Sequence, residues 1–584
     1  MQPRRSSRTA AAKSTSVAAS QVAAKASTKK ASKSAPKPVA KPVAKAASKA
    51  KAKAKADDKA APKATSRGRG ASKKRPAPRD NSPEPPAKRS KAAPKVIVNG
   101  ADNAEEKSTE EQPAKEPKPK EKKAPAPRKP HAQTKPYFNP LPAPPEHARP
   151  ALQMFVWGTG NFGQFGMGAD FLGEYGKPKK NVWIEKKIQE GVFGEENAGL
   201  EAVAAGGLHS LFIDEKGAIW SCGVNDDAAL GRITANVPNP EKEGEFLDVD
   251  ELTAEPHPLQ SLIDEKFRAV RVAAGDTISA AISAEGELRV WGSFRGVEGV
   301  LGFSSGQKHQ FLPISILDLP SKPGDAEKFT AVAAGNNHLL VLTTHGNVYT
   351  WGAGEQGQLG RKVLERRKLN GTVPEKIVLG ARSHKAVVVG AGNYSSFAVD
   401  ENGDVWAWGL NNMGQLGTGF AAAAADGEVG LPKKVRGLSK AELGDGATVV
   451  QIAGGEHHTL FLTSTGKVYA VGRSEGGQLG LADDDAAFKD REFPDMLSEP
   501  ALITFPDADD PVTYISAGIH TNTAVTRGGA LYSWGTGPQG ELGLEDETEV
   551  RTPRVVVRKE GGSWAAVAAS CGGQHTLALL RKKN

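Results

Sequence analysis

The chain has 584 residues and two parts of opposite charge: residues 1–135 have a net charge of +25, whereas residues 136–584 have a net charge of −15. It has no apolar run of about 18 residues, which excludes a membrane-spanning helix, and its N-terminus, MQPRRSSRTA, lacks the apolar stretch of a secretory signal. The two cysteines, Cys222 and Cys571, are far apart in sequence, which argues against a disulfide-stabilised protein. Neither has a metal-ligating residue at zinc-finger spacing, which argues against a zinc site.

Residues 1–135 form a basic tail without a single Phe, Trp or Tyr, in stretches such as KPVAKPVAKAASKAKAKAKA. A segment of this composition cannot bury enough apolar surface to offset its chain entropy, so we expect it to be disordered. Its lysines can neutralise nucleic-acid phosphates without adopting a fold. The alternative interpretation is a solvated linker that binds nothing.

Two basic clusters in the tail are separated by twelve residues, in the pattern of a bipartite nuclear localisation signal. Their residues are Lys73, Lys74, Arg75, Lys88, Arg89 and Lys91. This pattern predicts recognition by nuclear import receptors. Ser82 precedes a proline in the spacer, where a phosphate would add negative charge beside both clusters and tune import.

After a linker at 136–151, two sequence elements alternate seven times over residues 152–580. The first is an Ala-Gly step followed by an apolar strand, and it begins at residues 205, 274, 334, 391, 453, 517 and 571, where Cys571 replaces Ala. The second is a strand that ends in Trp-Gly, with tryptophans Trp157, Trp291, Trp351, Trp408 and Trp534, and with Cys222 and Val471 in the two remaining places. Glycine-containing turns separate the halves, which predicts β-hairpins too small to bury their own faces. Seven such units in a ring form a propeller.

The order of the two halves predicts how the ring closes. The chain enters the repeats on a Trp-Gly half, MFVWG at 154–158, and leaves on the other half, GGQHTLALL at 572–580. We expect these two half-blades to pair into the seventh blade, because pairing leaves no free edge strand. The predicted fold is therefore all-β: a seven-bladed β-propeller closed by its N- and C-terminal strands.

A further signature, Gly-Gln-Leu-Gly, follows several Trp-Gly steps, as at 357–360 and 414–417. Together with the Ala-Gly-Gly-x-His step at 205–209, it resembles the repeat of the regulator of chromosome condensation family over about residues 152–580. The resemblance implies the seven-bladed propeller. It also implies a chromatin-bound guanine-nucleotide exchange factor for the nuclear Ran GTPase, which supports nucleocytoplasmic transport and assembly of the mitotic spindle and nuclear envelope.

Histidines recur in the steps, where His209, His338, His457 and His575 each lie three residues after a glycine. A residue that every blade repeats is expected to be scaffold, and we interpret His209 and His575 in this way. Function is expected where one blade departs from the others, because a partner covers only part of the ring.

Three departures match positions that lie at the GTPase interface in the family. Asp276 follows the glycine of the second step, Asn337 lies two residues after the glycine of the third step, and His457 begins the histidine pair of the fifth. The resemblance implies that these residues bind the GTPase. Animal members have Asp at the place of Asn337, which can form hydrogen bonds but offers no charge.

The segment after Trp291-Gly292 is longer than the ordinary link and reads Ser-Phe-Arg-Gly-Val-Glu-Gly-Val-Leu-Gly at 293–302. It resembles a segment that forms a projecting β-wedge against the nucleotide site of the GTPase in exchange factors of the family. The wedge residues implied here are Ser293, Phe294, Arg295, Gly296, Val297 and Glu298.

A basic loop, residues 361–368, follows the Gly-Gln-Leu-Gly signature of the third blade. In the family, a loop at this position reaches the acidic patch of the histone surface. The resemblance implies that Arg361, Arg366 and Arg367 bind the nucleosome, since the planar guanidinium engages carboxylates in pairs. The alternative is a solvated loop without a partner.

No catalytic motif competes with exchange: the sequence has no nucleophile elbow, no His-Glu-x-x-His and no Walker loop. We therefore expect no covalent chemistry, cofactor, metal or membrane partner. The rival interpretations are a chromatin-binding propeller scaffold without exchange activity, an ultraviolet photoreceptor and a ubiquitin ligase. The photoreceptor would need tryptophans within the Gly-x-His step, and the ligase a further domain, which we do not expect after the last strand. The acidic loops 236–256 and 482–499 have no predicted role.

Overall fold

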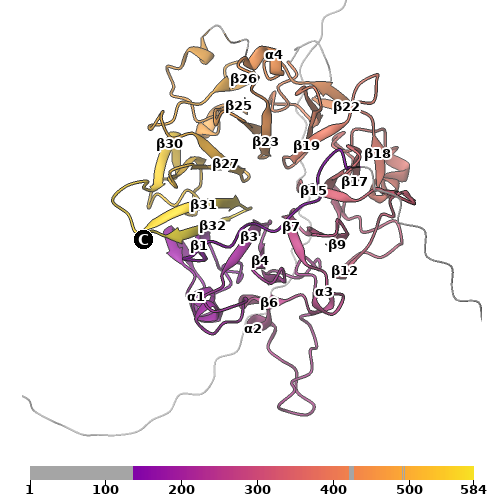
Figure 1. Ribbon diagram of the computed structural model, residues 1–584, viewed down its shortest axis with the longest axis vertical. Helices are drawn as coiled ribbons and strands as arrows, with labels where there is room; N and C mark the ends of the chain where they lie inside the picture. The colour runs from indigo at the N-terminus through magenta and orange to yellow at the C-terminus, as the bar shows by residue number, and fades with distance from the viewer. Residues whose placement is uncertain (1–135, 420–426, 490, 492) are drawn as a thin grey trace, which may run out of the picture. The chain divides into compact units, whose positions relative to one another are not determined.

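The computed structural model describes residues 136–419, 427–489, 491 and 493–584. They form a ring of seven four-stranded sheets around a central channel (Figure 1), which confirms the predicted all-β propeller. The basic tail, with its predicted disorder, phosphate binding and nuclear localisation signal, lies outside the described residues. Within the described ranges, no helix combines the length and the apolar composition that a bilayer crossing requires.

Six blades are formed by consecutive segments, and we number them in chain order. The strands of each blade are given from the channel outwards. Blade 1 contains β3 (Leu200–Ala205), β4 (His209–Asp214), β5 (Ile219–Gly223) and β6 (His257–Pro258); blade 2 contains β7 (Ala269–Ala274), β8 (Ile278–Ser283), β9 (Leu288–Gly292) and β12 (Gln310–Ile314); and blade 3 contains β15 (Phe329–Ala334), β16 (His338–Thr343), β17 (Val348–Gly352) and β18 (Glu375–Ile377). Blade 4 contains β19 (Ala386–Ala391), β20 (Ser395–Asp400), β21 (Val405–Leu410) and β22 (Glu428–Lys434); blade 5 contains β23 (Val449–Gly454), β24 (His458–Thr463), β25 (Val468–Arg473) and β26 (Met496–Leu502); and blade 6 contains β27 (Val512–Ala517), β28 (Thr521–Thr526), β29 (Leu531–Thr536) and β30 (Glu549–Val557).

Short elements occupy the loops between these strands. They comprise the hairpins β10 (Arg295–Gly296) with β11 (Gly299–Val300) and β13 (Ser321–Lys322) with β14 (Asp325–Ala326); the α-helices α1 (Val182–Gln189), α2 (Val249–Ala254), α3 (Gln260–Asp264) and α4 (Lys440–Leu443); and the 3-10 helices η1 (Ala169–Phe171), η2 (Glu365–Thr372), η3 (Glu475–Gly477) and η4 (Ala486–Phe488).

Blade 7 closes the ring by combining the two ends of the repeat region. Its strands are β31 (Trp564–Cys571), β32 (His575–Lys582), β1 (Leu152–Thr159) and β2 (Glu174–Lys180), in that order. The yellow β32 lies beside the indigo β1 in Figure 1, and the two pair antiparallel from Leu152 opposite Arg581 to Gly158 opposite His575. The predicted closure is confirmed, and it leaves no unpaired strand between the first and last blades.

The Trp-Gly and Gly-Gln-Leu-Gly signatures lock neighbouring blades together. The five tryptophans of the Trp-Gly steps are fully buried. Trp408 Nε1 donates to the Gln358 carbonyl of the preceding blade at 3.0 Å, and Trp534 Nε1 donates to the Gln478 carbonyl at 3.2 Å. The glycine that follows is needed for space: a Cβ on Gly292, whose φ is +105°, would lie 2.1 Å from the Thr277 carbonyl oxygen.

The step histidines form a second lock between blades, with one correction to the sequence interpretation. His209 Nε2 lies 2.9 Å from Ser279 Oγ of the next blade, and His575 Nε2 lies 2.9 Å from Ser210 Oγ. In blade 5 the equivalent residue is His458, because it pairs opposite Gly472 at the strand position that these histidines occupy. In the fifth step Gly454 occupies the strand position that Ala205 occupies in the first step, so counting from Gly454 selected His457 instead.

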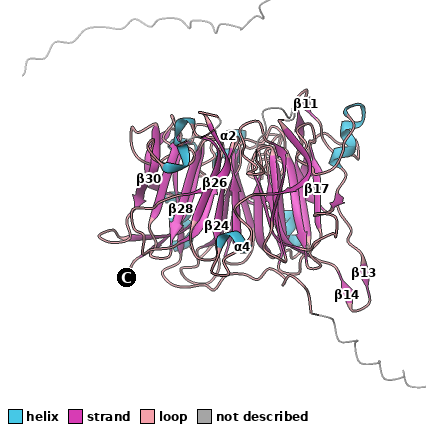
Figure 2. Ribbon diagram, turned by 90° about the horizontal axis from the view of Figure 1, so that it is seen from above, coloured by secondary structure: helices cyan, strands magenta, loops and turns pink. Residues whose placement is uncertain are grey.

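The ring has two faces that receive different connections. In each meander, the Ala-Gly step and the loop after the third strand emerge at one end, and the hairpin turn and the link to the next blade emerge at the other. β10 and β11 lie on the first face, which we call the wedge face. β13 and β14 project from the opposite face, as Figure 2 shows.

Residues 136–151, the predicted linker, run across this opposite face as a strap. The buried side chain of Asn139 donates to the Thr343 carbonyl at 3.0 Å and to the Ala386 carbonyl at 2.9 Å, so it bridges blades 3 and 4. Arg149 pairs with both carboxylate oxygens of Glu215 in blade 1, at 3.0 and 2.8 Å. The strap therefore spans several blades before it continues into β1.

Candidate interface on the wedge face

The predicted wedge is a short hairpin that projects from blade 2. Arg295 pairs with Val300 and Gly296 with Gly299, so Val297 and Glu298 form the turn. Val297 is 78% exposed, whereas Ser293 and Phe294 are fully buried at the root. We therefore restrict the name wedge to residues 295–300. The two root residues, which the sequence interpretation included, are anchors.

Packing and hydrogen bonds explain why the root is rigid. Phe294 packs against Phe303, with ring centroids 5.3 Å apart, inside the core between blades 2 and 3. Ser293 Oγ donates to the Lys308 carbonyl at 2.7 Å. The wedge thus rises from a fixed base, and its exposed tip carries one apolar side chain, Val297, beside the charged Glu298.

Blade 3 holds the wedge from one side. The backbone N–H of Arg295 donates to Asn337 Oδ1 at 2.9 Å, and that of Val297 donates to Glu355 Oε1 at 3.2 Å. Lys368 forms an ion pair with Glu298 at the tip, which lowers the pKa of Glu298. Both partners of this pair are exposed enough that the contact adds little stability. The side chain of Asn337 is thus occupied by the wedge.

Blade 1 holds the wedge from the other side. The Arg295 guanidinium pairs with the largely buried carboxylate of Asp227. A cavity of about 240 Å³ lies beside this pair and is lined by Asp226, Asp227, Asp276 and Arg295, among others. Burial raises the pKa of Asp276, the charge of Arg295 opposes this rise, and Asp227 adds to it. The structure therefore brings Asp276, Asn337 and the wedge together.

His457 lies apart from this group, in the fifth step, three blades further around the ring. Its neighbours are Glu456, Arg473 and His520, and Glu456 Oε2 lies 3.7 Å from His520 Nε2. Burial lowers the pKa of both His457 and His520. His520 occupies in blade 6 the place that His457 occupies in blade 5, and the sequence interpretation did not single it out.

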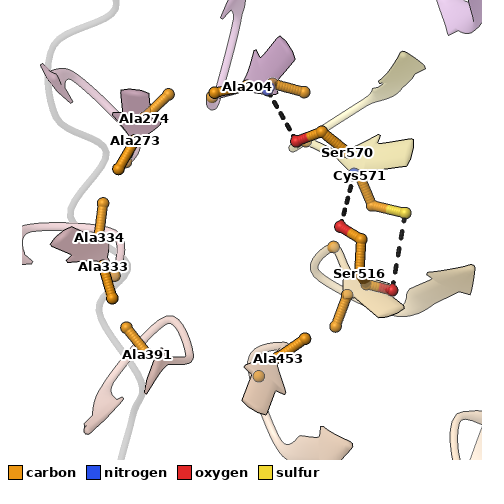
Figure 3. A pocket seen from close by; sticks show the side chains of 18 of the residues that line it. Ala204, Ala273, Ala274, Ala333, Ala334, Ala391, Ala453, Ser516, Ser570 and Cys571 are labelled. Carbon is orange, nitrogen blue, oxygen red and sulfur yellow. Dashed lines mark hydrogen bonds between the residues drawn. The ribbon is translucent and has the colours of Figure 1, made fainter. Parts of the chain in front are cut away.

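The seven steps encircle the mouth of the central channel and are joined to one another. Asp276 N donates to the Asn336 carbonyl at 2.8 Å, and Asn336 N donates to the Asn393 carbonyl at 3.0 Å. The channel, a cavity of about 540 Å³, is lined mainly by alanines and glycines such as Ala204, Ala273 and Ala333 (Figure 3). Ser570 Oγ accepts from the Ala205 N–H at 2.9 Å across one blade boundary. These bonds make the rim a rigid frame for its side chains.

The basic loop lies beside the wedge on the same face. Arg361 is folded into the loop: its guanidinium donates to the Gly371 and Val373 carbonyls at 3.1 and 2.8 Å and lies 3.4 Å from Glu375. Arg366 and Arg367 are exposed in η2. Of the three arginines predicted to bind the nucleosome, two are therefore presented to solvent, and Arg361 shapes the loop.

Two residues at this site were missed by sequence reasoning, namely Asp227 and Glu355. Each lies in the turn after the third strand of a blade that flanks the wedge, at 225–231, where Ala228 and Ala229 replace the Gly-Gln of the signature, and at 354–360, which carries the signature. An acidic residue in both flanking turns is the sequence signal that could have revealed them. Within the described ranges, no group of three or more His, Cys, Asp or Glu is arranged to hold a metal ion.

Comparisons with known proteins agree with this architecture. A family model described as an RCC1-like domain matches residues 153–578. Protein pim1 of Schizosaccharomyces pombe is 35% identical over 438 residues, 74% of this chain and 75% of the relative. Guanine nucleotide exchange factor SRM1 of Saccharomyces cerevisiae is 32% identical over 448 residues, 73% of this chain and 86% of the relative.

A solved structure resembles the ring as a whole. The crystal structure of Prp20p from Saccharomyces cerevisiae, described with its binding properties to Gsp1p and histones, has 29% identity and a TM-score of 0.62. The similarity covers 77% of this chain and 93% of that chain. By its repeats, its ring and these matches, the chain belongs to the family of RCC1-like domain proteins.

Proposed function

We propose that this chain is a guanine-nucleotide exchange factor whose substrate is the Ran GTPase. The observation that carries the proposal is the wedge: a hairpin that presents the exposed side chain of Val297 at its tip and stands on a buried root beside the channel rim. The name of the SRM1 relative supports exchange, and the description of Prp20p with Gsp1p supports a GTPase partner.

Exchange requires binding energy and no covalent step. A GTPase with nanomolar to picomolar affinity for its nucleotide stores about 12–16 kcal/mol in that complex. A single hydrogen bond contributes about 0.5–3 kcal/mol, so one contact cannot displace the nucleotide. A broad interface on the rim, together with a wedge that occupies space at the nucleotide site, can do so. Nucleotide and factor then weaken each other reciprocally.

The rim residues have distinct roles in this proposal. Asp276 and His457 contact the GTPase, one beside the wedge and one across the channel mouth. Asn337 acts through the wedge, since its Oδ1 accepts the Arg295 N–H. The net charge of −15 over residues 136–584 complements a basic partner surface and steers its approach.

We further propose that the protein works on chromatin in the nucleus and so supports nucleocytoplasmic transport, spindle assembly and nuclear envelope assembly. Arg366 and Arg367 bind the acidic patch of the histone surface, the basic tail binds DNA phosphates, and import receptors bind the two basic clusters of the tail. The exposure of Arg366 and Arg367 and the description of Prp20p with histones support this part of the proposal.

The test is release of labelled GDP from purified Ran in the presence of the full chain. We expect the wild-type protein to accelerate release. In one variant, residues 295–300 are replaced by a short Gly-Ser link. With this variant, we expect Ran to release GDP about tenfold more slowly than with the wild type, which corresponds to an activation barrier about 1.4 kcal/mol higher. The variant retains Ser293 and Phe294, so its melting temperature should stay close to that of the wild type.

Two results would contradict the proposal. A wedge variant that releases GDP at the wild-type rate would show that the wedge has no part in exchange. A wild-type chain that binds nucleosomes but leaves GDP release unchanged would establish the alternative, a chromatin-binding scaffold.

A further inference from the structure

The wedge is too small to hold its own position. Its ladder contains two residue pairs, and a hairpin of this size has little stability in water by itself. Its tip is exposed, so core packing fixes only the root. The direction in which Val297 points must therefore depend on contacts from neighbouring blades.

Besides Asn337 and Lys368 of blade 3, two acidic side chains supply such contacts, and they do so from opposite sides. Glu355 of blade 3 accepts the Val297 N–H, and Asp227 of blade 1 pairs with the Arg295 guanidinium. The sequence separations, 58 and 68 residues, correspond to one blade in each direction. The two residues lie in equivalent turns, one in each blade next to the wedge.

The backbone of the wedge is adapted to the Glu355 contact. A Cβ on Gly296 would lie 2.4 Å from Glu355 Oε1, so the carboxylate can approach only because residue 296 is a glycine. Asp227 is largely buried, and its Oδ1 also faces His309 Nδ1 at 3.4 Å. Burial strengthens a charged contact relative to an exposed pair such as Lys368 with Glu298.

We propose that Glu355 and Asp227 are positioning residues that hold the wedge upright, Glu355 through the amide of Val297 and Asp227 through the side chain of Arg295. They act through the wedge and not on the GTPase itself. The expected effect on GDP release rests on the proposed exchange function. The orientation of the wedge is a property of the free protein, so it can be measured without a GTPase.

The first experiment measures amide hydrogen exchange over residues 295–300 in the free full-length chain. Glu355→Leu removes the acceptor, whereas Glu355→Gln keeps an oxygen at the same place. Asn412→Leu is the matched control, since Asn412 holds the equivalent position two residues before the glycine of the blade 4 turn, and its side chain bonds Gln415 within that turn. We expect amide exchange in the wedge to rise about tenfold in Glu355→Leu and to stay near wild type in Glu355→Gln and Asn412→Leu.

The second experiment measures GDP release from Ran as a function of factor concentration. We expect Glu355→Leu to lower the maximal rate about tenfold and to leave the half-saturating concentration within about twofold, because the rim still binds. Asp227→Ala should do the same, and Glu355→Gln should restore most of the rate. Melting temperatures of all variants are measured alongside.

Unchanged amide exchange in Glu355→Leu would overturn the positioning role, whatever the release rates. So would rate losses in Glu355→Leu and Asn412→Leu that are equal and follow their melting temperatures. If the wild-type chain fails to accelerate release, the proposed function falls, and the amide measurement still decides whether Glu355 holds the wedge.

Discussion

Two adjacent histidines in blade 5 have opposite surroundings. His458 lies in β24, is buried, and its Nε2 lies 2.7 Å from Asn522 Oδ1 of blade 6; burial lowers its pKa to about 4. His457 precedes the strand and is only half-buried. One residue of register thus separates a side chain that joins two blades from a half-buried one on the wedge face.

This difference predicts that substitution of the two histidines has different effects on stability and on GDP release. His458→Ala leaves the buried Asn522 Oδ1 without its partner and opens a cavity, so we expect a loss of about 2–4 kcal/mol in unfolding free energy. His457→Ala should cost less than about 1 kcal/mol and should slow GDP release. Thermal unfolding and release assays on both variants test this. Equal stability losses would show that the register assigned here is wrong.

The buried step histidines also predict how stability depends on pH. Burial lowers the pKa of His209, His338 and His458 to about 4, from about 6.5 in the unfolded chain. The unfolded chain therefore binds more protons between these values, and stability falls as the pH drops from about 6.5 towards 4. Each histidine should cost on the order of 1 kcal/mol by pH 5.5.

Urea unfolding at pH 7.0 and pH 5.5 checks this expectation. His338→Gln removes one titrating group, so its loss of stability between the two pH values should be about 1 kcal/mol smaller than that of the wild type. Carboxylates with altered pKa values contribute equally to both proteins and cancel in the difference. Identical losses would mean that His338 is not neutral in the fold.

The repeats made the architecture predictable from the sequence, whereas the side-chain contacts between blades could not be predicted. Seven copies of one hairpin specify a ring, and the half-repeats at 154–158 and 572–580 specify its closure. The sequence also located the wedge segment, but it could not show that Phe294 turns into the core and Arg361 into its own loop. Asp227 and Glu355 were missed because each acts on a residue one blade away, and nothing in a linear sequence pairs them.

At the scale of elements, the loop after the third strand is where the blades differ. In blade 2 this loop forms the wedge, and in blade 3 it forms the basic loop with η2, whose Lys368 reaches the wedge tip. These loops also carry the carbonyl groups that the Trp-Gly tryptophans bind, since Trp408 of blade 4 donates to Gln358 in the loop of blade 3. In blade 2 the wedge replaces the Gly-Gln-Leu-Gly signature, and Trp351 Nε1 of blade 3 has no hydrogen-bond partner among the described residues. The wedge is therefore present at the expense of one bond between blades.

We predict that the basic loop and the tail contribute different kinds of binding. Arg366→Ala with Arg367→Ala should weaken nucleosome binding and leave naked-DNA binding nearly unchanged, because an arginine fork suits carboxylates on a histone surface. Deleting residues 1–135 should weaken both and flatten the salt dependence, by about 0.9 in log–log slope for each phosphate that the shortened protein no longer neutralises. Binding titrations at several salt concentrations measure both effects.

A double change of Arg551 and Arg554 to Ala is the matched control, since both are exposed arginines on a different blade. It should affect neither ligand. If the Arg366 and Arg367 changes weaken naked-DNA binding as much as nucleosome binding, the loop contacts phosphate only, and histone recognition by the loop should be abandoned.

At the scale of the whole molecule, the ring depends on β1. This strand forms hydrogen-bonded pairs with both β32 and β2 in blade 7, so its loss exposes the edge of β32 and detaches β2. We predict that a chain beginning at residue 136 unfolds at the wild-type temperature, whereas a chain beginning at residue 160 aggregates. Light scattering and thermal unfolding test this. A monomeric, cooperatively folded 160–584 fragment would show that the other six blades are stable as an open arc.

The strap also determines how the molecule bears tension. A force applied to the chain ahead of residue 136 reaches Asn139 before it reaches blade 7. The load falls first on the hydrogen bonds of Asn139 to blades 3 and 4, and then on the paired contacts of Arg149 with Glu215. These bonds can break and re-form while β1 stays in its sheet. We therefore expect the bonds of the strap to yield before the pairing of β1 when force is applied to the N-terminal end of the chain.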